Sequence, residues 1–350
     1  MTRFLQLHLL TFYPPANLNR DDAGRPKTAV VGGTPRLRVS SQSLKRAWRT
    51  SEAFRDALRG HIAERTQRLG EVALKHLLER GVPQDAAMGA ARAVAAVFGR
   101  VKPEADSNPA RTEQLAFVSP QEREAALVMA ERVAAGEPAP KPADLLRRTD
   151  AAADIAMFGR MLADAPDFNR EAAVQVAHAV TTHRAVVEDD YYTAVDDLKQ
   201  PSEDAGAGFI GEQGFGSGVF YLYACADVAL LARNLGGDAV LAGAALAALA
   251  EAAATVAPSG KQASFASRAR AHYVLAERGD QQPRTLAGAF VPAVEGGDPI
   301  GASIAKLRAW RERLDRAYGP GADATEEMDV PGDRGTLAGV AAFCRAAAGG

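Results

Sequence analysis

The sequence predicts an α+β fold in which alternating strands are interrupted by a block of helices. Residues 3–12 alternate in polarity, with Leu5, Leu7 and Leu9 on one face, which is the period of a strand. From residue 61 to about 134 the apolar residues recur at helical spacing instead. Further strand and helix patterns follow, so the helical block is predicted to be an insertion into an α+β domain.

The first strand leads through a basic segment into the first helix. Pro14 and Pro15 are expected to end the strand, because proline has no N–H to donate to a sheet. Extended residues 36–40 then precede a helix that begins near Ser41, a residue type suited to N-capping. The helix is predicted over 42–58 and is closed by Gly60, whose missing Cβ suits a left-handed cap.

The helical block has breaks of its own. They fall at residues 81–83, at 103–109 and at Pro120, where Gly and Pro punctuate the helical pattern. The Pro-rich stretch 136–144 reads as the connector that closes the insertion.

Strands return after the insertion. Residues 173–183 alternate and are predicted to form a central strand, and residues 218–226 are predicted to form another. Between them, residues 199–218 are rich in Gly and polar side chains, which predicts a long hairpin or loop. The remaining expected elements are a helix over 238–256, a turn at 258–260, a strand over 271–276, and helices over 302–317 and 335–347.

Without the insertion and the loop, the order of elements is close to βαββαβ. That is the order of a ferredoxin-like or RRM-like sandwich, a fold that often presents its sheet to RNA. The aromatic RNP motif of RNA-reading strands is absent, and fold analogy alone does not establish function. If the chain binds RNA, we therefore expect it to grip the backbone rather than to read bases.

Composition narrows the class of protein. With 350 residues and 47% hydrophobic content, the chain can bury a substantial core in one large domain or two. Cys225 and Cys344 are too few and too far apart for a disulfide framework or a metal cluster, which favours a reducing cytoplasmic setting. No stretch has the pattern of a signal peptide or a membrane span. We expect a soluble cytoplasmic protein.

Positive charge is concentrated near the first helix. Between residues 20 and 49 there are eight basic side chains and two acidic ones, a local net charge of 8 − 2 = +6, whereas the whole chain carries −2. A helix N-terminus leaves backbone N–H groups unpaired, so Ser40, Ser41 and Gln42 form a natural anion cradle. Lys45 and Arg49 lie four residues apart and share one helix face, from which they could reach successive phosphates.

A run of basic residues on a helix is often only a solvated face. Here the charges continue through three local structures with almost no interleaved carboxylates, which favours nucleic acid. A protein-only scaffold, in which this segment binds an acidic partner, stays open as an alternative.

Several motifs together carry a family likeness. They are Asn19-Arg20-Asp21-Asp22, Lys27, Gly32-Gly33, the run from Arg36 to Ala47, Gly159-Arg160-Met161, His178 with Thr181-Thr182-His183, Thr193 to Leu198, and Gly218-Val219-Phe220-Tyr221. In this order they resemble the CRISPR Cascade backbone subunit of type I-E systems, the CasC family. The helical block from about 60 to 150 has no residue-by-residue match.

The resemblance implies a hand-shaped protein. Its RRM-like palm would comprise residues 1–59, 151–187 and 219–350, with helical fingers at 60–150 and a β-hairpin thumb at 188–218. Such a protein has no cofactor and no catalytic or metal site. It polymerises head to tail along a CRISPR guide RNA and holds the guide so that a target DNA strand can pair with it. The other implied partners are the large, small, 5′-handle-capping and RNA-processing subunits of Cascade.

The resemblance also implies roles for individual residues. Guide phosphates would be neutralised by Arg20, Lys27, Arg38, Lys45, Arg46 and Arg49, with hydrogen bonds from Ser40 and Gln42. Met161, flanked by Arg160, resembles an apolar wedge beneath a displaced nucleotide, although a methionine in isolation is ordinarily a core residue. Lys261 and Gln262 resemble a further backbone contact, and the match becomes partial at Ser264.

The predicted thumb is acidic. Residues 188–204 hold seven acidic side chains and one lysine, a local net charge of 1 − 7 = −6. An acidic projection could dock on the basic palm of a neighbouring copy, the heterologous geometry that builds open helical filaments. The alternative is that these acids only keep an exposed hairpin soluble.

The main rival from another class is a metal-dependent nuclease. Its ligands would be His178 and His183 with the nearby aspartates Asp189, Asp190, Asp196 and Asp197. The two histidines are five positions apart, which places them on opposite faces of a strand and well apart around a helix. The sequence also lacks a nucleophile elbow and Walker A spacing, so other enzyme classes are disfavoured.

Overall fold

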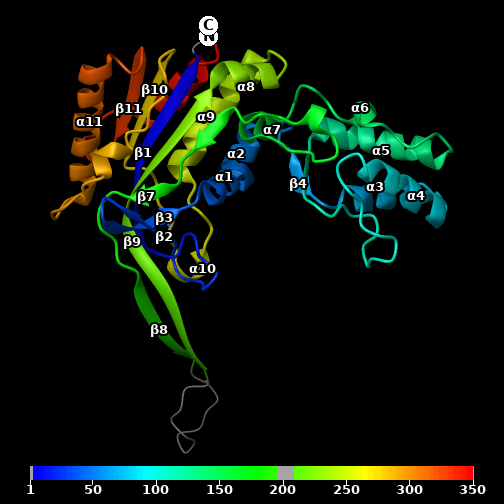
Figure 1. Cartoon of the computed structure of the whole chain (residues 1–350), viewed down its shortest axis with the longest axis horizontal. Helices are drawn as coiled ribbons and strands as arrows, with labels where there is room; N and C mark the ends of the chain where they lie inside the picture. Colours follow the sequence, from blue (N-terminus) through cyan, green and yellow to red (C-terminus); the bar gives the residue numbers. More distant parts are fainter. Residues whose placement is uncertain (1–2, 195–208, 350) are drawn as a thin grey trace, which may run out of the picture.

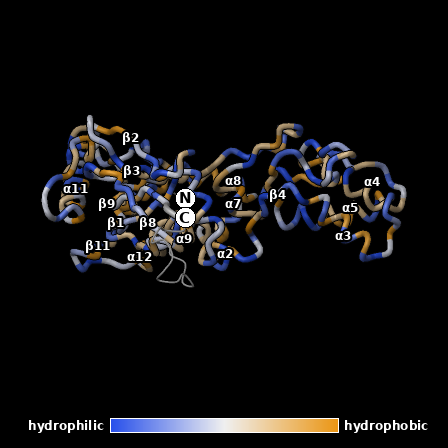
Figure 2. The backbone as a smooth tube through the Cα atoms, turned by 90° about the horizontal axis from the view of Figure 1, so that it is seen from below, coloured by the Kyte–Doolittle hydropathy of each residue, from blue (hydrophilic) through white to orange (hydrophobic). Residues whose placement is uncertain are grey.

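The computed structural model describes residues 3–194 and 209–349. Figure 1 shows three parts: a twisted sheet with helices against it, a helical lobe to one side, and a long two-stranded hairpin that projects from the sheet. In the orthogonal view of Figure 2, the lobe and the sheet lie at opposite ends of the molecule, with β4 between them. The expected α+β class is confirmed, with a mostly antiparallel sheet.

The main sheet has nine strands. Seven of them lie in the order β11-β10-β1-β9-β7-β3-β2, and β6 and β8 also pair with β9. The strands are β1 (Phe4–Ala16), β2 (Thr28–Val31), β3 (Thr34–Val39), β6 (Val174–Val176), β7 (Ala179–Thr181), β8 (Glu188–Ala194), β9 (Phe209–Asp227), β10 (Tyr273–Gly279) and β11 (Ala324–Asp329).

Strand β1 is longer than its sequence predicts. It runs through Pro14 and Pro15 to Ala16 instead of ending before them, and its register with β9 shifts between Tyr13 and Ala16. Because the two prolines lack N–H donors, regular pairing fails there, but β9 still continues alongside. On its other edge, β1 pairs with β10 from Phe4 to Leu10.

Strand β9 forms one arm of a hairpin, which is one of the two structures predicted for residues 199–218. The described part of that segment is strand, and it is continuous with the expected strand at 218–226. Its first half pairs with β8, with Glu188 opposite Phe215 and Ala194 opposite Phe209. Glycines do not stop this strand, because its partner supplies a continuous hydrogen-bond ladder. The chain between the two strands lies outside the described residues.

The central strand predicted over 173–183 is divided. Strands β6 and β7 each pair with β9, and the chain leaves regular pairing at Ala177 and His178. There the Ala177 N–H donates to the carbonyl of Tyr223, at 2.9 Å. Beyond the break, β7 also pairs with β3, so this edge of the sheet connects to the basic segment.

The first helix is divided as well, into α1 (Ser41–Thr50) and α2 (Glu52–Ala57). The Ser51 hydroxyl donates to the carbonyl of Trp48 and accepts from the N–H of Phe54. A short polar side chain thus ends one helix and caps the next, an outcome that periodicity does not reveal. Gly60 is in the left-handed region, with φ of 83°, as expected.

Helices cover both faces of the sheet. Leu5, Leu7 and Leu9 pack with the Ala-rich α9 (Ala239–Thr255), which α12 (Leu337–Ala346) also contacts. On the opposite face, Leu10 belongs to a second apolar cluster with Leu307 of α11 (Pro299–Tyr318). The residues of β1 alternate as predicted, and both faces of the strand are buried.

The helical lobe has its own core. It is formed by α3 (Leu69–Glu79), α4 (Gln84–Ala95) and α5 (Pro120–Ala134), as the helical spacing predicts. The sequence did not predict the small sheet of β4 (Glu64–Thr66) and β5 (Ala116–Val118), which connects the lobe to the rest of the chain. The shorter helices are α6 (Pro142–Leu145), α7 (Ala153–Phe158), α8 (Val228–Asn234) and α10 (Gln262–Phe265).

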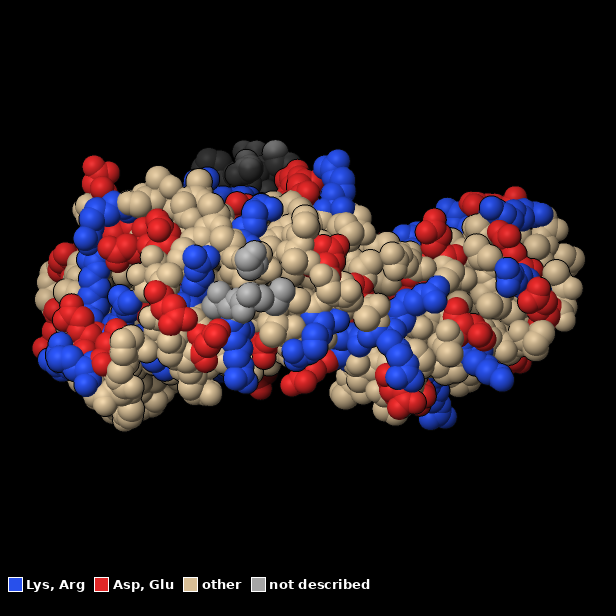
Figure 3. All heavy atoms as spheres, turned by 90° about the horizontal axis from the view of Figure 1, so that it is seen from above, with Lys and Arg blue, Asp and Glu red and all other residues tan. Residues whose placement is uncertain are grey.

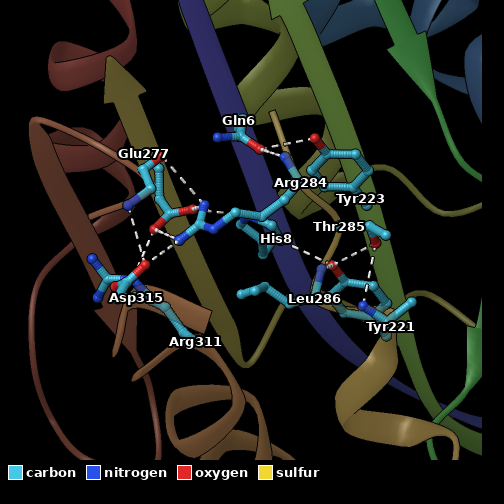
Figure 4. Close-up of polar contacts among 12 residues, drawn as sticks. Gln6, His8, Tyr221, Tyr223, Glu277, Arg284, Thr285, Leu286, Arg311 and Asp315 are labelled. Carbon is cyan, nitrogen blue, oxygen red and sulfur yellow. Dashed lines mark hydrogen bonds and ion pairs between the residues drawn. The ribbon is translucent and has the colours of Figure 1, made fainter. Parts of the chain in front are cut away.

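A buried ionic network fastens α11 to the sheet (Figure 4). The carboxylate of Glu277 on β10 accepts hydrogen bonds from Arg284 at 2.6 Å and from Arg311 at 2.7 Å. It also contacts His8 of β1 at 3.2 Å, and Arg284 donates a further hydrogen bond to Asp315 at 3.1 Å. Burial by itself would raise the pKa of Glu277, but the hydrogen bonds from His8 and Arg284 outweigh it and lower that pKa to about 2.

We expect Glu277→Gln to destabilise the protein by about 3–5 kcal/mol, because it leaves buried arginine charge without its partner. Thermal or denaturant unfolding measures the change. The matched control is Glu312→Gln on the exposed side of α11, which is expected to change stability by less than about 0.5 kcal/mol. Equal stability of the two variants would contradict a structural role for the network.

Candidate nucleic-acid interface

The start of α1 organises the basic segment. Its N-cap is Ser40 and not Ser41 as expected: the Ser40 hydroxyl accepts a hydrogen bond from the N–H of Ser43. The backbone N–H of Ser40 donates to the side chain of Asn19, at 2.9 Å, which ties residues 17–20 to the helix start. Helix α1 begins one residue after a β-region serine, which is the usual N-cap geometry.

A groove runs along one face of α1. It has a volume of about 180 Å³ and is lined by Gln42, Lys45, Arg46 and Arg49, together with Arg65, Phe117 and Phe158. The sequence predicted the first four residues as RNA contacts, and the structure brings them to one groove. Their i, i+3 and i+4 spacing on a helix explains this arrangement.

Arg49 lies at the inner wall of this groove. One of its guanidinium nitrogens is 3.4 Å from the buried carboxylate of Asp154, and its Cζ is 4.9 Å from the centre of the Phe117 ring. Burial lowers the pKa of Arg49, and Asp154 opposes that effect. Arg49 is therefore partly engaged within the protein, whereas Gln42 and Arg46 are exposed.

Arg20 and Arg46 line a second, polar hollow with Ser43, Ser259 and Gly260. Glycine is required at 260, since a Cβ there would lie 2.3 Å from the carbonyl oxygen of Leu18. This close approach brings the predicted contacts Lys261 and Gln262 to the edge of the basic segment. The Gln262 amide donates to the carbonyls of Pro258 and Ser267, so it also shapes its own loop. The weaker candidate, Ser264, is exposed on α10.

Lys27 and Arg38 form a separate cationic group with His178. The Arg38 guanidinium lies 2.8 Å from Nδ1 of His178. Burial lowers the pKa of His178, and the charges of Arg38 and Lys27 lower it further. A neutral imidazole can accept a hydrogen bond from Arg38 and so orient it.

Arg36 does not contribute to the basic surface. Its side chain is fully buried and donates to the carbonyls of Thr181 and Phe290, at 3.1 and 3.0 Å. Arg25 is exposed but forms an ion pair with Asp189 of β8, at 2.8 Å. The uncompensated charge is thus smaller than the count of basic residues predicts. It is concentrated around α1 and β3.

The predicted wedge residue, Met161, is 82% exposed, so it is not a core methionine. Paired backbone hydrogen bonds between Arg160 and Arg170 hold it beside a cavity of about 640 Å³. Gly159 precedes it with φ of 82°, a conformation that favours glycine. An exposed thioether in a fixed position is available to fill a gap in a bound strand.

The expectation for Arg160 is wrong with respect to its side chain. Arg160 is fully buried and pairs with Glu122 at 2.6 Å, so its guanidinium does not reach the surface. Glu122 also caps α5 through the N–H of Ser119. Arg160 therefore joins the lobe to the loop that holds Met161, and its burial requires this partner.

The groove along α1 and the cavity beside Met161 lie next to each other. Arg65, Phe117 and Phe158 line both of them. The sequence missed Arg65 and Phe117, because they lie in the block that gave no recognisable motif. Only the pairing of β4 with β5 shows that they lie side by side.

The histidines of the rival nuclease are already engaged. His183 uses both ring nitrogens, at 2.8 Å from the carbonyl of Arg184 and 3.1 Å from the N–H of Val219. Asp190 accepts from Gln213, and Asp189 pairs with Arg25. No group of three or more potential metal ligands occurs among the described residues, and Asp196 and Asp197 lie outside them.

Charge elsewhere is mixed. On the face seen in Figure 3, Lys and Arg are interspersed with Asp and Glu, the pattern of an ordinary solvated surface. Helices long and apolar enough to cross a membrane are absent from residues 3–194 and 209–349.

Comparison with known proteins decides the family. The sequence pattern of the CT1975-like proteins matches residues 5–336. The chain belongs to this CT1975-like family. A chain of a solved structure described as "CRISPR RNA-guided surveillance complex, pre-nicking" is 32% identical with a TM-score of 0.85, and covers 98% of this chain and 100% of its own length. A chain of another "CRISPR RNA-guided surveillance complex" is 28% identical with a TM-score of 0.73, over 98% and 99% of the two chains.

No curated protein matches the CT1975-like chain. The family and the two structural likenesses support a Cascade-type CRISPR protein, as the sequence motifs predict.

The buried carboxylate beside Arg49 predicts a pH effect. Burial raises the pKa of Asp154 to about 6 from its ordinary 3.8. The folded state therefore holds the Asp154 proton more tightly than the unfolded state does. Protonation of Asp154 stabilises the folded protein at low pH, and this stabilisation is lost as the pH rises through 6. Relative to Asp154→Asn, the wild type should lose up to about 3 kcal/mol of unfolding free energy between about pH 4 and 7.5.

Denaturant unfolding of both proteins across this pH range measures the difference. A stability difference that does not change with pH would show that Asp154 titrates normally in the folded protein.

Proposed function

We propose that this CT1975-like chain is a non-catalytic backbone subunit that binds CRISPR guide RNA in a type I-E Cascade complex. The groove from α1 to Met161 carries the proposal, because it combines exposed cations, a helix N-terminus and an exposed apolar wedge. The similarity to chains of RNA-guided surveillance complexes supplies the class of ligand.

The chemistry of the groove favours phosphates over bases. Lys45 presents a compact ammonium charge and Arg46 a planar guanidinium group. The first turn of α1 adds backbone N–H groups and the positive end of the helix dipole. Lys27, which directly precedes β2, and Arg38 on β3 supply a second cationic group. Contacts to phosphates carry no base identity, which suits a guide whose sequence must vary.

The palm is RRM-like in this proposal. The four strands of the βαββαβ unit lie in the order β10-β1-β9-β6, with α9 against one face. The other face is covered by α11 and the buried network around Glu277, so it is closed to RNA. RNA is accordingly assigned to the edge of the palm, between α1 and the β4–β5 sheet.

Assembly follows from the projecting hairpin. Strands β8 and β9 extend away from the sheet, and β8 carries Glu188, Asp189 and Asp190 (Figure 1). We assign this hairpin to head-to-tail contact with the next copy in the cytoplasm, so that copies follow one guide RNA. The held guide pairs with a target DNA strand, and the large, small, 5′-handle-capping and RNA-processing subunits complete the particle.

Backbone gripping predicts strong dependence on salt. Lys27→Gln and Lys45→Gln should each weaken binding of single-stranded RNA by about fivefold at 0.1 M salt and reduce the slope of log K against log salt by about 0.7. The loss should be equal for a repeat-derived RNA and for an unrelated sequence, in titrations followed by fluorescence anisotropy.

The matched control is Lys75→Gln, an exposed lysine on α3 that pairs with Glu79. It is expected to bind RNA like the wild type. A loss confined to one RNA sequence would contradict the backbone-gripping proposal.

Met161→Ala separates the wedge from the phosphate contacts. Because Met161 is exposed, its loss should leave folding and the salt slope unchanged. We expect a change in the accessibility of individual bases of bound RNA to chemical probes, with affinity altered less than twofold, which is about 0.4 kcal/mol. An unchanged probing pattern would remove Met161 from the proposal.

A further inference from the structure

The small sheet of β4 and β5 places one cation and one aromatic ring opposite each other. In its antiparallel register Arg65 is directly opposite Phe117. Both side chains line the groove of α1 and the cavity of Met161. They therefore lie where the two halves of the candidate interface join.

Arg65 differs from its charged neighbours because it has no ion pair among the described residues. Glu64 pairs with Arg123, Arg68 with Glu71, and Glu113 with Arg100. Arg65 is exposed and lines the groove beside the cations of α1. Burial lowers the pKa of Arg49, and the charges of Arg65 and Arg46 lower it further. A cluster of like charges that repel one another is stabilised when an anion binds among them.

Phe117 holds the two sides of the cluster in place. The Cζ of Arg65 is 5.6 Å from the centre of its ring, and that of Arg49 is 4.9 Å away. A guanidinium group that stacks on an aromatic ring keeps its N–H edge free to donate to phosphate oxygens. The ring thus positions Arg65 without neutralising it.

We propose that Arg65 is a further RNA-binding residue, which contacts a guide phosphate between the α1 contacts and Met161, and that Phe117 positions its guanidinium. This inference rests on the proposed function and extends the interface from the palm onto the helical lobe. A strand bound along α1 would pass Arg65 before it reaches Met161, because the two hollows share this residue.

The test compares Arg65→Gln with Arg68→Gln in the full-length chain. Arg68 is three residues away, exposed, and paired with Glu71, so its loss removes equal charge outside the groove. The probe is a repeat-derived single-stranded RNA, titrated at several salt concentrations. We expect Arg65→Gln to bind about fivefold more weakly at 0.1 M salt with a slope reduced by about 0.7, and Arg68→Gln to match the wild type.

Phe117→Leu tests the positioning role, since it removes the ring but keeps every charge. Its affinity should fall while its salt slope stays that of the wild type, and thermal melting confirms that the variant is folded. Equal affinities and slopes for the Arg65 and Arg68 variants would overturn this inference while a loss in Lys45→Gln still supports the proposed function. Failure of the wild type to bind RNA would overturn both.

Discussion

The antiparallel pairing of β1 with β9 is the interaction on which the rest of the structure depends. From Phe4 opposite Asp227 to Tyr13 opposite Gly218, the two strands form a continuous ladder in the centre of the sheet. Beyond it, the same β9 continues into the projecting hairpin with β8. One strand therefore belongs to both the core and the projection. Its register places β6 and β7 on its other edge and so locates β3 and the start of α1.

The interface is assembled from segments that the sheet brings together. Residues 17–20 are held against α1 by Asn19, and the loop of Lys261 approaches them because Gly260 has no side chain. The buried pair of Arg160 and Glu122 connects the helical lobe to the loop of Met161. The positive groove thus lies between α1 and the small sheet of β4 and β5. The main sheet and the helical lobe each have an apolar core of their own.

The sequence predicted the parts of this site that are local. Periodicity located α1, and the i, i+4 spacing of Lys45 and Arg49 correctly predicted one shared face. The sequence could not predict that Arg36 and Arg160 are buried, because their partners are distant in the chain. Arg36 donates to Thr181 and Phe290, and Arg160 pairs with Glu122. Arg65 and Phe117 were missed because they lie in the helical block, which gave no recognisable motif, and only the pairing of β4 with β5 brings them together. The break between α1 and α2 depends on the hydroxyl of Ser51, and the length of β9 depends on its pairing with β8. Hydrophobic periodicity reveals neither of these.

The most direct test of the central claim is to co-express the full chain with its neighbouring Cascade subunits and a CRISPR transcript, and to purify the assembly. RNA sequencing and native mass spectrometry then identify what is bound and how many copies are present. The account predicts a defined repeat-derived RNA that carries several copies of this chain. A monomer free of nucleic acid at low salt, with the other subunits present, would contradict it.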